Sequence, residues 1–294
     1  MNSIEYNQCP CCKANPISKL KYPYSTTYNK ICFNYLKCSN CGVVFVAPMP
    51  DKETFAKMYA KANYHDFHYQ DKNIAEYTYS TKLLKQYLPT GSSVLDYGCG
   101  TGEFLIELKK EGFLPYGVEF DDEATNFASQ KIACKVVSVD DFKKQPVKPM
   151  FDAIHFGDVL EHLPNPTETL TYLLAYLNPG GILFAEGPLE SNPSPIYWAS
   201  RIFGIFKRLI HPKFLAQHPP HHLFICDASQ QLDFFLRVEP RLSVELWQIY
   251  ETGWPYAEGG LLKRAIAKLA IFIGGRKLLG VTFGNRFRGV FSIP

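Results

Sequence analysis

The sequence predicts an α/β protein, in which helices cover both faces of a parallel β-sheet and a small module precedes the sheet. From residue 94 onward, short apolar runs such as VLDYG, YGVEF, KVVSV and GGILFAEGP alternate with segments of helical pattern. Buried strands that alternate with helices form parallel sheets. Most of the nine cysteines lie within residues 9–41, ahead of this pattern. They therefore mark a separate module.

Length and composition bound the possible functions. The chain has 294 residues, enough for one full-sized core and a smaller appended module. Its formal net charge of +3 does not indicate a nucleic-acid partner, because such proteins concentrate more Lys and Arg on one face. The first ten residues lack the pattern of a signal peptide, and no apolar run is long enough to cross a bilayer. We therefore expect a cytoplasmic protein whose cysteines are thiols or metal ligands.

Three regions follow one another along the chain. Residues 1–50 form the cysteine-rich module, which closes at the prolines of VAPMP. Residues 51–90 have a helical pattern and form a connector. Residues 91–294 form the α/β domain. Within this domain, residues 188–222 replace the strand and helix alternation with an aromatic, proline-rich insertion.

The segments after the insertion complete the predicted domain. Asp227 and Gln230 have the spacing of a capping box at the start of a helix. A strand follows in RLSVELWQI, then an amphipathic helix in LLKRAIAKLAIFI, and RFRGVFSI forms a closing strand. No acidic residue follows Glu258. We expect the amphipathic helix to pack on the sheet. The alternative is that its basic face attracts a membrane surface or a phosphorylated or lipid-linked acceptor.

The stretch VLDYGCGTGEF places a glycine-rich turn between a strand and a helix, where many chains bind nucleotide-like ligands. A pyrophosphate would lie at the helix N-terminus, but Asp96 and Glu103 carry negative charge at that place. The turn therefore favours a cationic ligand, such as one with an ammonium and a sulfonium group. A tight turn that only packs the helix on the sheet is the alternative. The three glycines are Gly98, Gly100 and Gly102.

Glu119 ends the next predicted strand, at about the interval from Asp96 expected of an acid that accepts hydrogen bonds from ribose hydroxyls. The ligand then has a ribose but no phosphate at the turn. S-adenosylmethionine meets both conditions.

Three motifs in order, VLDYGCGTGEF, the acid of GVEFD, and FDAIHFGDVLEHL, resemble the class I S-adenosylmethionine-dependent methyltransferases over about the last two thirds of the chain. The resemblance implies a Rossmann-like sheet of seven mostly parallel strands, whose last strand, RFRGVFSI, is antiparallel. It also implies that Asp140 and Asp141 lie where the family contacts adenine, although one of them could only cap the next segment. The predicted cofactor-binding residues are Asp96, Gly98, Gly100, Gly102, Glu119, Asp140, Asp141, Gly157 and Asp158.

Several polar residues follow the fourth strand of the predicted sheet and fall at the edge where ligands bind. Among them, His162 could act as a base toward a hydroxyl or an acidic carbon, because imidazole titrates near neutral pH. Alternatively, it packs beneath the cofactor. Glu161, beside it, and Glu186, after the following strand, add carboxylates at this edge.

A second group of histidines, His211, His218, His221 and His222, lies in IHPKFLAQHPPHHLF. Their spacing matches no common zinc pattern, and the prolines favour a rigid loop. His221 or His222 could serve as the base or orient the acceptor, unless both are surface residues. The candidate catalytic residues are His162, His221 and His222.

Two CxxC pairs in the first 41 residues have the spacing that lets four thiolates surround Zn²⁺. A closed site of this kind is structural. Cys11 and Cys32 are further thiols, so either could replace a ligand. A redox dithiol is the alternative, although two matched pairs favour one metal site. The predicted ligands, in a zinc-ribbon-like module, are Cys9, Cys12, Cys38 and Cys41.

The stretch CGVVFVAPMP and the tyrosine-rich segment after it are similar to zinc modules joined to one branch of small-molecule methyltransferases. That branch includes sugar C-methyltransferases, so the resemblance implies an acceptor that is a sugar, a nucleotide-linked sugar or a related glycan or natural-product precursor. Tyr64 and Tyr69 are candidates for its pocket. The alternatives are an RNA methyltransferase that grips RNA through the zinc module and a cofactor-binding protein without transfer activity.

Overall fold

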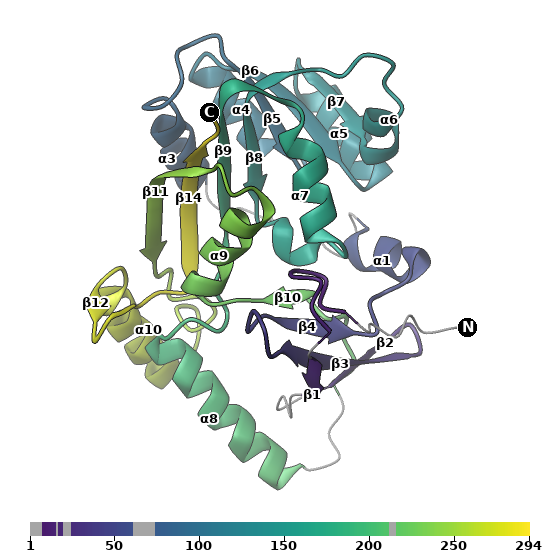
Figure 1. Cartoon of the computed structure of the whole chain (residues 1–294). Helices are drawn as coiled ribbons and strands as arrows, with labels where there is room; N and C mark the ends of the chain where they lie inside the picture. Colours follow the sequence, from purple (N-terminus) through teal and green to yellow (C-terminus); the bar gives the residue numbers. More distant parts are fainter. Residues whose placement is uncertain (1–7, 16, 20–24, 61–73, 212–215) are drawn as a thin grey trace.

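Figure 1 shows the computed structural model, which describes residues 8–15, 17–19, 25–60, 74–211 and 216–294. Tyr64 and Tyr69 lie outside the described residues. No helix in the described part of the chain is long and apolar enough to cross a membrane.

The central sheet has seven strands in the order β11-β14-β9-β8-β5-β6-β7. Four neighbouring pairs are parallel, whereas β14 is antiparallel to both β9 and β11. This topology confirms the predicted seven-stranded, mostly parallel sheet with an antiparallel closing strand. The strands are β5 (Ser93–Tyr97), β6 (Leu114–Glu119), β7 (Lys135–Ser138), β8 (Phe151–Gly157), β9 (Leu177–Pro188), β11 (Ser243–Tyr250) and β14 (Arg286–Ser292).

Alternate residues of the strands enter two hydrophobic cores, one on each face of the sheet. Val94, Ala153 and Phe184 belong to the core under α3, α4 and α5. Their neighbours Leu95 and Ile154 belong to the core under α6, α7 and α9. The prediction of helices on both faces is therefore confirmed. These helices are α3 (Ile74–Leu84), α4 (Glu103–Lys110), α5 (Asp122–Lys131), α6 (Val139–Lys143), α7 (Pro166–Leu174) and α9 (Ala228–Val238).

The N-terminal module is a small antiparallel sheet that borrows one strand from the α/β domain. Its strand β10, Phe224–Ile225, pairs with β4 and comes from the chain after the aromatic insertion. Phe33 and Phe45 of the module are fully buried in the same core as the α7 and α9 face of the main sheet. The module and the domain therefore share one hydrophobic core. The other strands are β1 (Ile17–Lys19), β2 (Thr26–Tyr28), β3 (Ile31–Cys38) and β4 (Val44–Ala47).

Two caps fix helix starts near the domain junctions. Asp51 accepts a hydrogen bond from the Thr54 backbone N–H and begins α1 (Lys52–Tyr59), directly after the predicted end of the module. Asp227 and Gln230 form the predicted capping box of α9.

Helix α10 (Leu261–Ile273) does not pack on the sheet, so that prediction is wrong. It packs on α8 (Pro195–Ile210) through a small cluster that includes Ala267 and Ala270, and both helices extend away from the sheet in Figure 1. The reason is that α9 already covers β14, where the Phe235 and Phe291 rings pack 4.9 Å apart. The short strands β12 (Lys277–Leu278) and β13 (Val281–Thr282) follow α10.

Candidate active site

A pocket opens at the carboxyl ends of β5, β8 and β9, beside the N-terminus of α4. Five carboxylates line it, against one arginine and one histidine. Such a lining favours a ligand that carries positive charge. The lining residues are Glu76, Tyr77, Ser80, Asp96, Gly98, Cys99, Gly100, Thr101, Glu103, Phe104, His155, Gly157, Asp158, Glu186, Tyr250 and Arg286.

The glycine turn adopts a backbone that other residues rarely take. Gly98 and Gly102 have φ of 81° and 87°, in the left-handed region. A Cβ on Gly98 would lie 2.5 Å from a methyl group of Val159, and one on Gly102 would lie 2.1 Å from Ile132. The turn therefore packs closely between Val159, in the loop after β8, and Ile132, at the end of α5.

Glu119 closes the turn from the end of β6. One of its carboxylate oxygens accepts a hydrogen bond from Gly100 N–H at 2.8 Å, and the other accepts the N–H groups of Phe120 and Asp121. Each carboxylate oxygen can accept more than one bond, so ribose hydroxyls could be added.

A buried chain of polar contacts joins four strands beneath the pocket. The ring of His155 on β8 contacts Asp96 on β5 at 2.7 Å and lies 3.5 Å from Glu186 on β9. Glu186 also accepts hydrogen bonds from Ser80 on α3 and Arg288 on β14. Burial disfavours the charged imidazole, but Asp96 and Glu186 outweigh it and raise the pKa of His155 to about 9.

Asp158 and Arg286 form an ion pair at the wall of the pocket. Nη2 of Arg286 lies 2.7 and 2.8 Å from the two carboxylate oxygens of Asp158, and Nε donates to the Tyr250 hydroxyl. Asp158 has a φ of 55°, which turns its side chain out of the strand direction as β8 ends.

Two of the three predicted catalytic histidines meet beside this ion pair. Nε2 of His162, on the short 3₁₀ helix η1 (Leu160–His162), lies 3.9 Å from Glu161, and the rings of His162 and His222 are 4.9 Å apart. His221 is exposed and stacks on His218 instead.

The environment of this cluster raises the pKa values of Glu161 and His222. Burial and the charge of Asp158 raise the pKa of Glu161 to about 8. Burial disfavours a charged His222, but the carboxylate of Glu190, 2.5 Å from Nδ1, raises the pKa of His222 to about 9.

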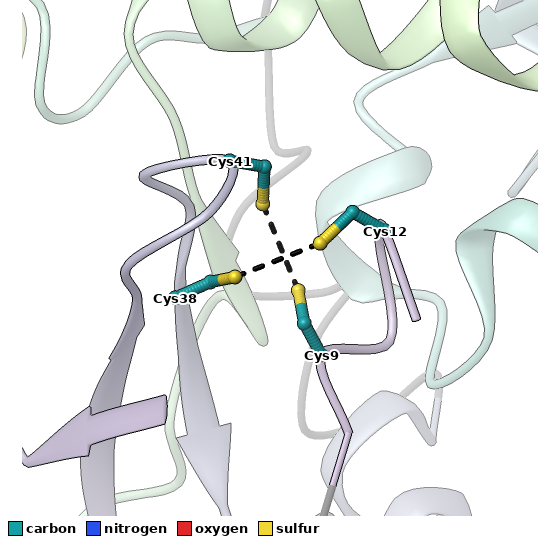
Figure 2. Close-up of side chains that lie close together, drawn as sticks. All are labelled: Cys9, Cys12, Cys38 and Cys41. Carbon is teal, nitrogen blue, oxygen red and sulfur yellow. Dashed lines mark hydrogen bonds between the residues drawn. The ribbon is translucent and has the colours of Figure 1, made fainter. Parts of the chain in front are cut away.

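The four predicted zinc ligands converge in the N-terminal module. Figure 2 shows their sulfur atoms pointing to a common centre, with Cys9 and Cys41 3.7 Å apart and Cys12 and Cys38 3.6 Å apart. A zinc–sulfur length of about 2.3 Å gives a tetrahedron with edges of about 3.8 Å. The cysteine spacing therefore fits the ion.

The two CxxC loops share one backbone geometry. The carbonyl oxygens of Cys9 and Cys38 accept the N–H groups of Lys13 and Gly42, each four residues on, at 2.8 and 2.9 Å. Lys13 and Gly42 both have positive φ. Matched loops that present four sulfurs to one point favour a single metal site over a redox pair.

Comparison with known proteins agrees with this geometry. Residues 68–221, more than half of the chain, match a protein family described as a methyltransferase domain. The chain belongs to this methyltransferase family.

Several curated proteins are similar to part of this chain. A putative methyltransferase of Geobacillus sp. (strain WCH70) is 32% identical over 114 residues, which cover 36% of this chain and 46% of that protein. A ubiquinone biosynthesis O-methyltransferase of Dechloromonas aromatica (strain RCB) is 29% identical over 116 residues, which cover 37% of this chain and 49% of that protein. The chain thus spans about half the length of these relatives.

Among solved structures, the complex between the Haloferax volcanii Trm112 methyltransferase activator and the putative methyltransferase contains a similar chain. The match has a TM-score of 0.54 and 14% identity, and it covers 84% of this methyltransferase and 99% of that chain. It supports the fold.

The structure brings most of the predicted cofactor residues of the methyltransferase to one place. Asp96, the three glycines, Gly157 and Asp158 all line the pocket, and Glu119 bonds the turn that forms its wall. Asp140 and Asp141 lie in α6, outside the pocket lining, and both are exposed. Neither caps α6, because Ser138 takes that position.

His155, Arg286 and Arg288 belong to the site although no motif in the sequence indicates them. The two arginines lie two positions apart in the predicted closing strand RFRGVFSI and so share one face of the sheet. Charged residues on a central strand are a sign of a buried polar site. His155 lies in an apolar strand, and Gly157, two residues on, leaves space for its ring: a Cβ at Gly157 would lie 2.7 Å from the imidazole.

We expect the methyltransferase to lose stability as the pH rises from 6.5 toward 9. The pKa of His155 is about 9 in the folded chain and about 6.5 when unfolded, so its favourable charge is fully present below the lower value and is lost through the upper one. His155→Gln can still donate to Asp96 but cannot titrate in this range. Urea unfolding at a series of pH values measures the difference, and equal pH dependence in both proteins would refute a charged His155.

Proposed function

We propose that this chain transfers a methyl group from S-adenosylmethionine to a small-molecule acceptor that carries hydroxyl groups, such as a sugar or nucleotide-linked sugar. The observation that carries the proposal is the acidic pocket at the glycine turn. Its carboxylates suit a sulfonium and an ammonium group, and would repel a pyrophosphate. The family match supports the same donor.

The residues around the turn would hold different parts of the cofactor. Glu119 would accept hydrogen bonds from the ribose, and Asp96 and Glu103 would face the positively charged end. Asp140 and Asp141 remain candidates for the adenine end. When bound, S-adenosylmethionine supplies an electrophilic methyl group on sulfur. The chain contributes alignment and exclusion of water, which methyl transfer chiefly needs.

The acceptor would approach from the side of Asp158, where His162 and His222 are the candidate bases. His221 remains a weaker candidate because it is exposed and stacked on His218. The insertion at residues 188–222, which ends in this histidine loop, would shape the acceptor pocket. The resemblance of the N-terminal module to those of sugar methyltransferases, and the relatives named as ubiquinone O-methyltransferases, favour an oxygen-rich small molecule.

Replacing Glu119 by Ala should weaken S-adenosylmethionine binding at least tenfold, because a charged hydrogen-bond acceptor contributes about 1.5–3 kcal/mol. Asp122→Asn removes an exposed charge three residues away and should leave the affinity unchanged. Isothermal titration calorimetry measures both.

An unchanged affinity in Glu119→Ala would contradict the cofactor assignment. Incubation with methyl-labelled S-adenosylmethionine and fractionated metabolites then identifies the acceptor. Transfer to RNA alone would favour the RNA methyltransferase, and bound cofactor without any transfer would favour a non-catalytic protein.

We propose that Cys9, Cys12, Cys38 and Cys41 bind one structural Zn²⁺. Two of the thiols are fully buried and two are partly exposed. Burial opposes the Cys12 thiolate, but the Ala14 N–H and the Asn40 amide stabilise it and lower the pKa of Cys12 to about 7. Four reduced thiols also fit a cytoplasmic location.

Metal analysis should find zinc bound to the chain, and Cys38→Ser should lose one zinc per chain. Cys32→Ser is the matched control, because Cys32 is exposed on β3 and stands outside the group of four. The melting temperature should fall in the first variant only, since the module shares its core with the domain. Full zinc content in Cys38→Ser would overturn the assignment.

A further inference from the structure

We propose that Glu161, His162 and His222 form a second metal site, which binds a first-row divalent cation on the acceptor side of the pocket. The catalytic role of this metal site rests on the proposed methyl transfer, whereas the presence of the site does not. One ligand atom from each of the three residues lies within 4.8 Å of the others. Two imidazoles and one carboxylate with positions left open are the donor set of catalytic zinc and non-haem iron sites.

The two rings are oriented as metal-binding histidines are. Nδ1 of His162 contacts the Tyr59 hydroxyl at 3.0 Å, and Nδ1 of His222 contacts Glu190 at 2.5 Å. Each histidine would therefore bind the cation through Nε2. Partners of this kind fix the tautomer and raise the basicity of the ligand nitrogen.

The carboxylate of Glu161 gives an independent sign of a missing ligand. The side chain is 8% exposed, and its Oε1 atom has no hydrogen-bond partner among the described residues. A buried polar oxygen without a partner costs free energy. Nε2 of His162 lies 3.9 Å away, too far for a hydrogen bond. A cation beside this oxygen would satisfy it.

The backbone holds the cluster rigidly beside the cofactor pocket. Leu223, next to His222, donates its N–H to the Glu161 carbonyl at 2.7 Å, and its own carbonyl accepts Val46 N–H at 3.0 Å. Asp158, three residues before Glu161, lines the pocket. With a cation bound, the two histidines would act as its ligands and not as bases. The cation would bind an acceptor oxygen and favour loss of its hydroxyl proton to solvent, which leaves the oxygen as the nucleophile.

Mn²⁺ is the probe of choice because it prefers oxygen ligands such as the Glu161 carboxylate to the thiolates of the N-terminal module. We expect the full-length chain to bind Mn²⁺ with one site, measured by electron paramagnetic resonance and by calorimetry. Glu161→Gln, which keeps the side-chain volume, and His222→Ala should each weaken binding at least tenfold. His211→Ala changes an exposed histidine on the same loop and should bind as the wild type does.

The outcomes separate this site from the proposed function. Equal Mn²⁺ affinity in all variants, or none in the wild type, would overturn the metal site whatever the affinity for S-adenosylmethionine. Mn²⁺ binding that depends on Glu161 in a chain that fails to bind S-adenosylmethionine would uphold the site and refute the proposed function. Far-ultraviolet circular dichroism confirms that each variant is folded.

A different observation carries a second proposal: the face formed by α8 and α10 docks on an anionic membrane surface. Large apolar side chains stand in solvent on both helices, with Leu209 72% and Leu262 65% exposed. Large apolar side chains gathered in solvent on two packed helices indicate an interaction site. Others on this face are Ile202, Phe206, Leu269 and Phe272.

The positive charge around this face favours binding to an anionic lipid surface. Helix α8 contains no acidic residue, and none follows Glu258 in the sequence. Lys263, Arg264 and Lys268 lie on α10, and Arg276 follows it. Apolar side chains among basic ones are the pattern of helices that lie in the membrane interface. Figure 1 shows α8 and α10 projecting beyond the end of the sheet, away from α4 and α5.

Co-sedimentation with vesicles tests this surface. We expect the chain to pellet with vesicles that contain phosphatidylserine, less with phosphatidylcholine alone, and less at high salt. Leu209→Asp with Leu262→Asp should reduce the bound fraction at least fivefold, whereas Val147→Asp, at an exposed position away from this face, should not. Absence of binding to either vesicle, or a dimer in sedimentation velocity that the double variant abolishes, would overturn the proposal.

Discussion

The buried polar chain from Asp96 through His155 and Glu186 to Arg288 is the interaction on which the pocket depends. It links β5, β8, β9 and β14 at the carboxyl edge of the sheet, and Ser80 brings α3 onto the same group. Removing one member would leave a buried charge without its partner, which is costly. Because the chain fixes the floor of the pocket, the glycine turn above it can present backbone N–H groups and carboxylates in a fixed arrangement.

The N-terminal module is tied to the same region by the backbone around Leu223. This residue bonds to Glu161 on one side and to Val46 of β4 on the other, and β10 continues from it into the module's sheet. The four cysteines hold the turn between β3 and β4, so a structural ion there would also steady the strand that carries the histidine loop. An ion bound there would therefore help to place the histidine loop beside Glu161.

Local sequence patterns were sufficient to predict the elements whose contacts lie between residues close in sequence. The CxxC pairs, the capping box at Asp227 and the apolar period of the strands each depend on residues close in sequence, and each appears in the structure as predicted. Helix α10 shows where such patterns fail. Its amphipathic pattern predicted a contact with the sheet. In the structure α9 covers that surface of the sheet, and the sequence of α10 alone does not indicate that another helix occupies it.

The sequence by itself determined the parallel sheet, the glycine turn with its acid at Glu119 and the four-cysteine group, because residue spacing alone encodes each of them. Only the tertiary structure decided which polar residues meet. Arg286 reaches Asp158 across 128 positions, and His222 reaches His162 across 60, because sheet order and the return of β10 bring them together. Such contacts depend on the burial of two hydrophobic cores. The free energy of that burial is spread over many residues, so no single sequence motif predicts these contacts.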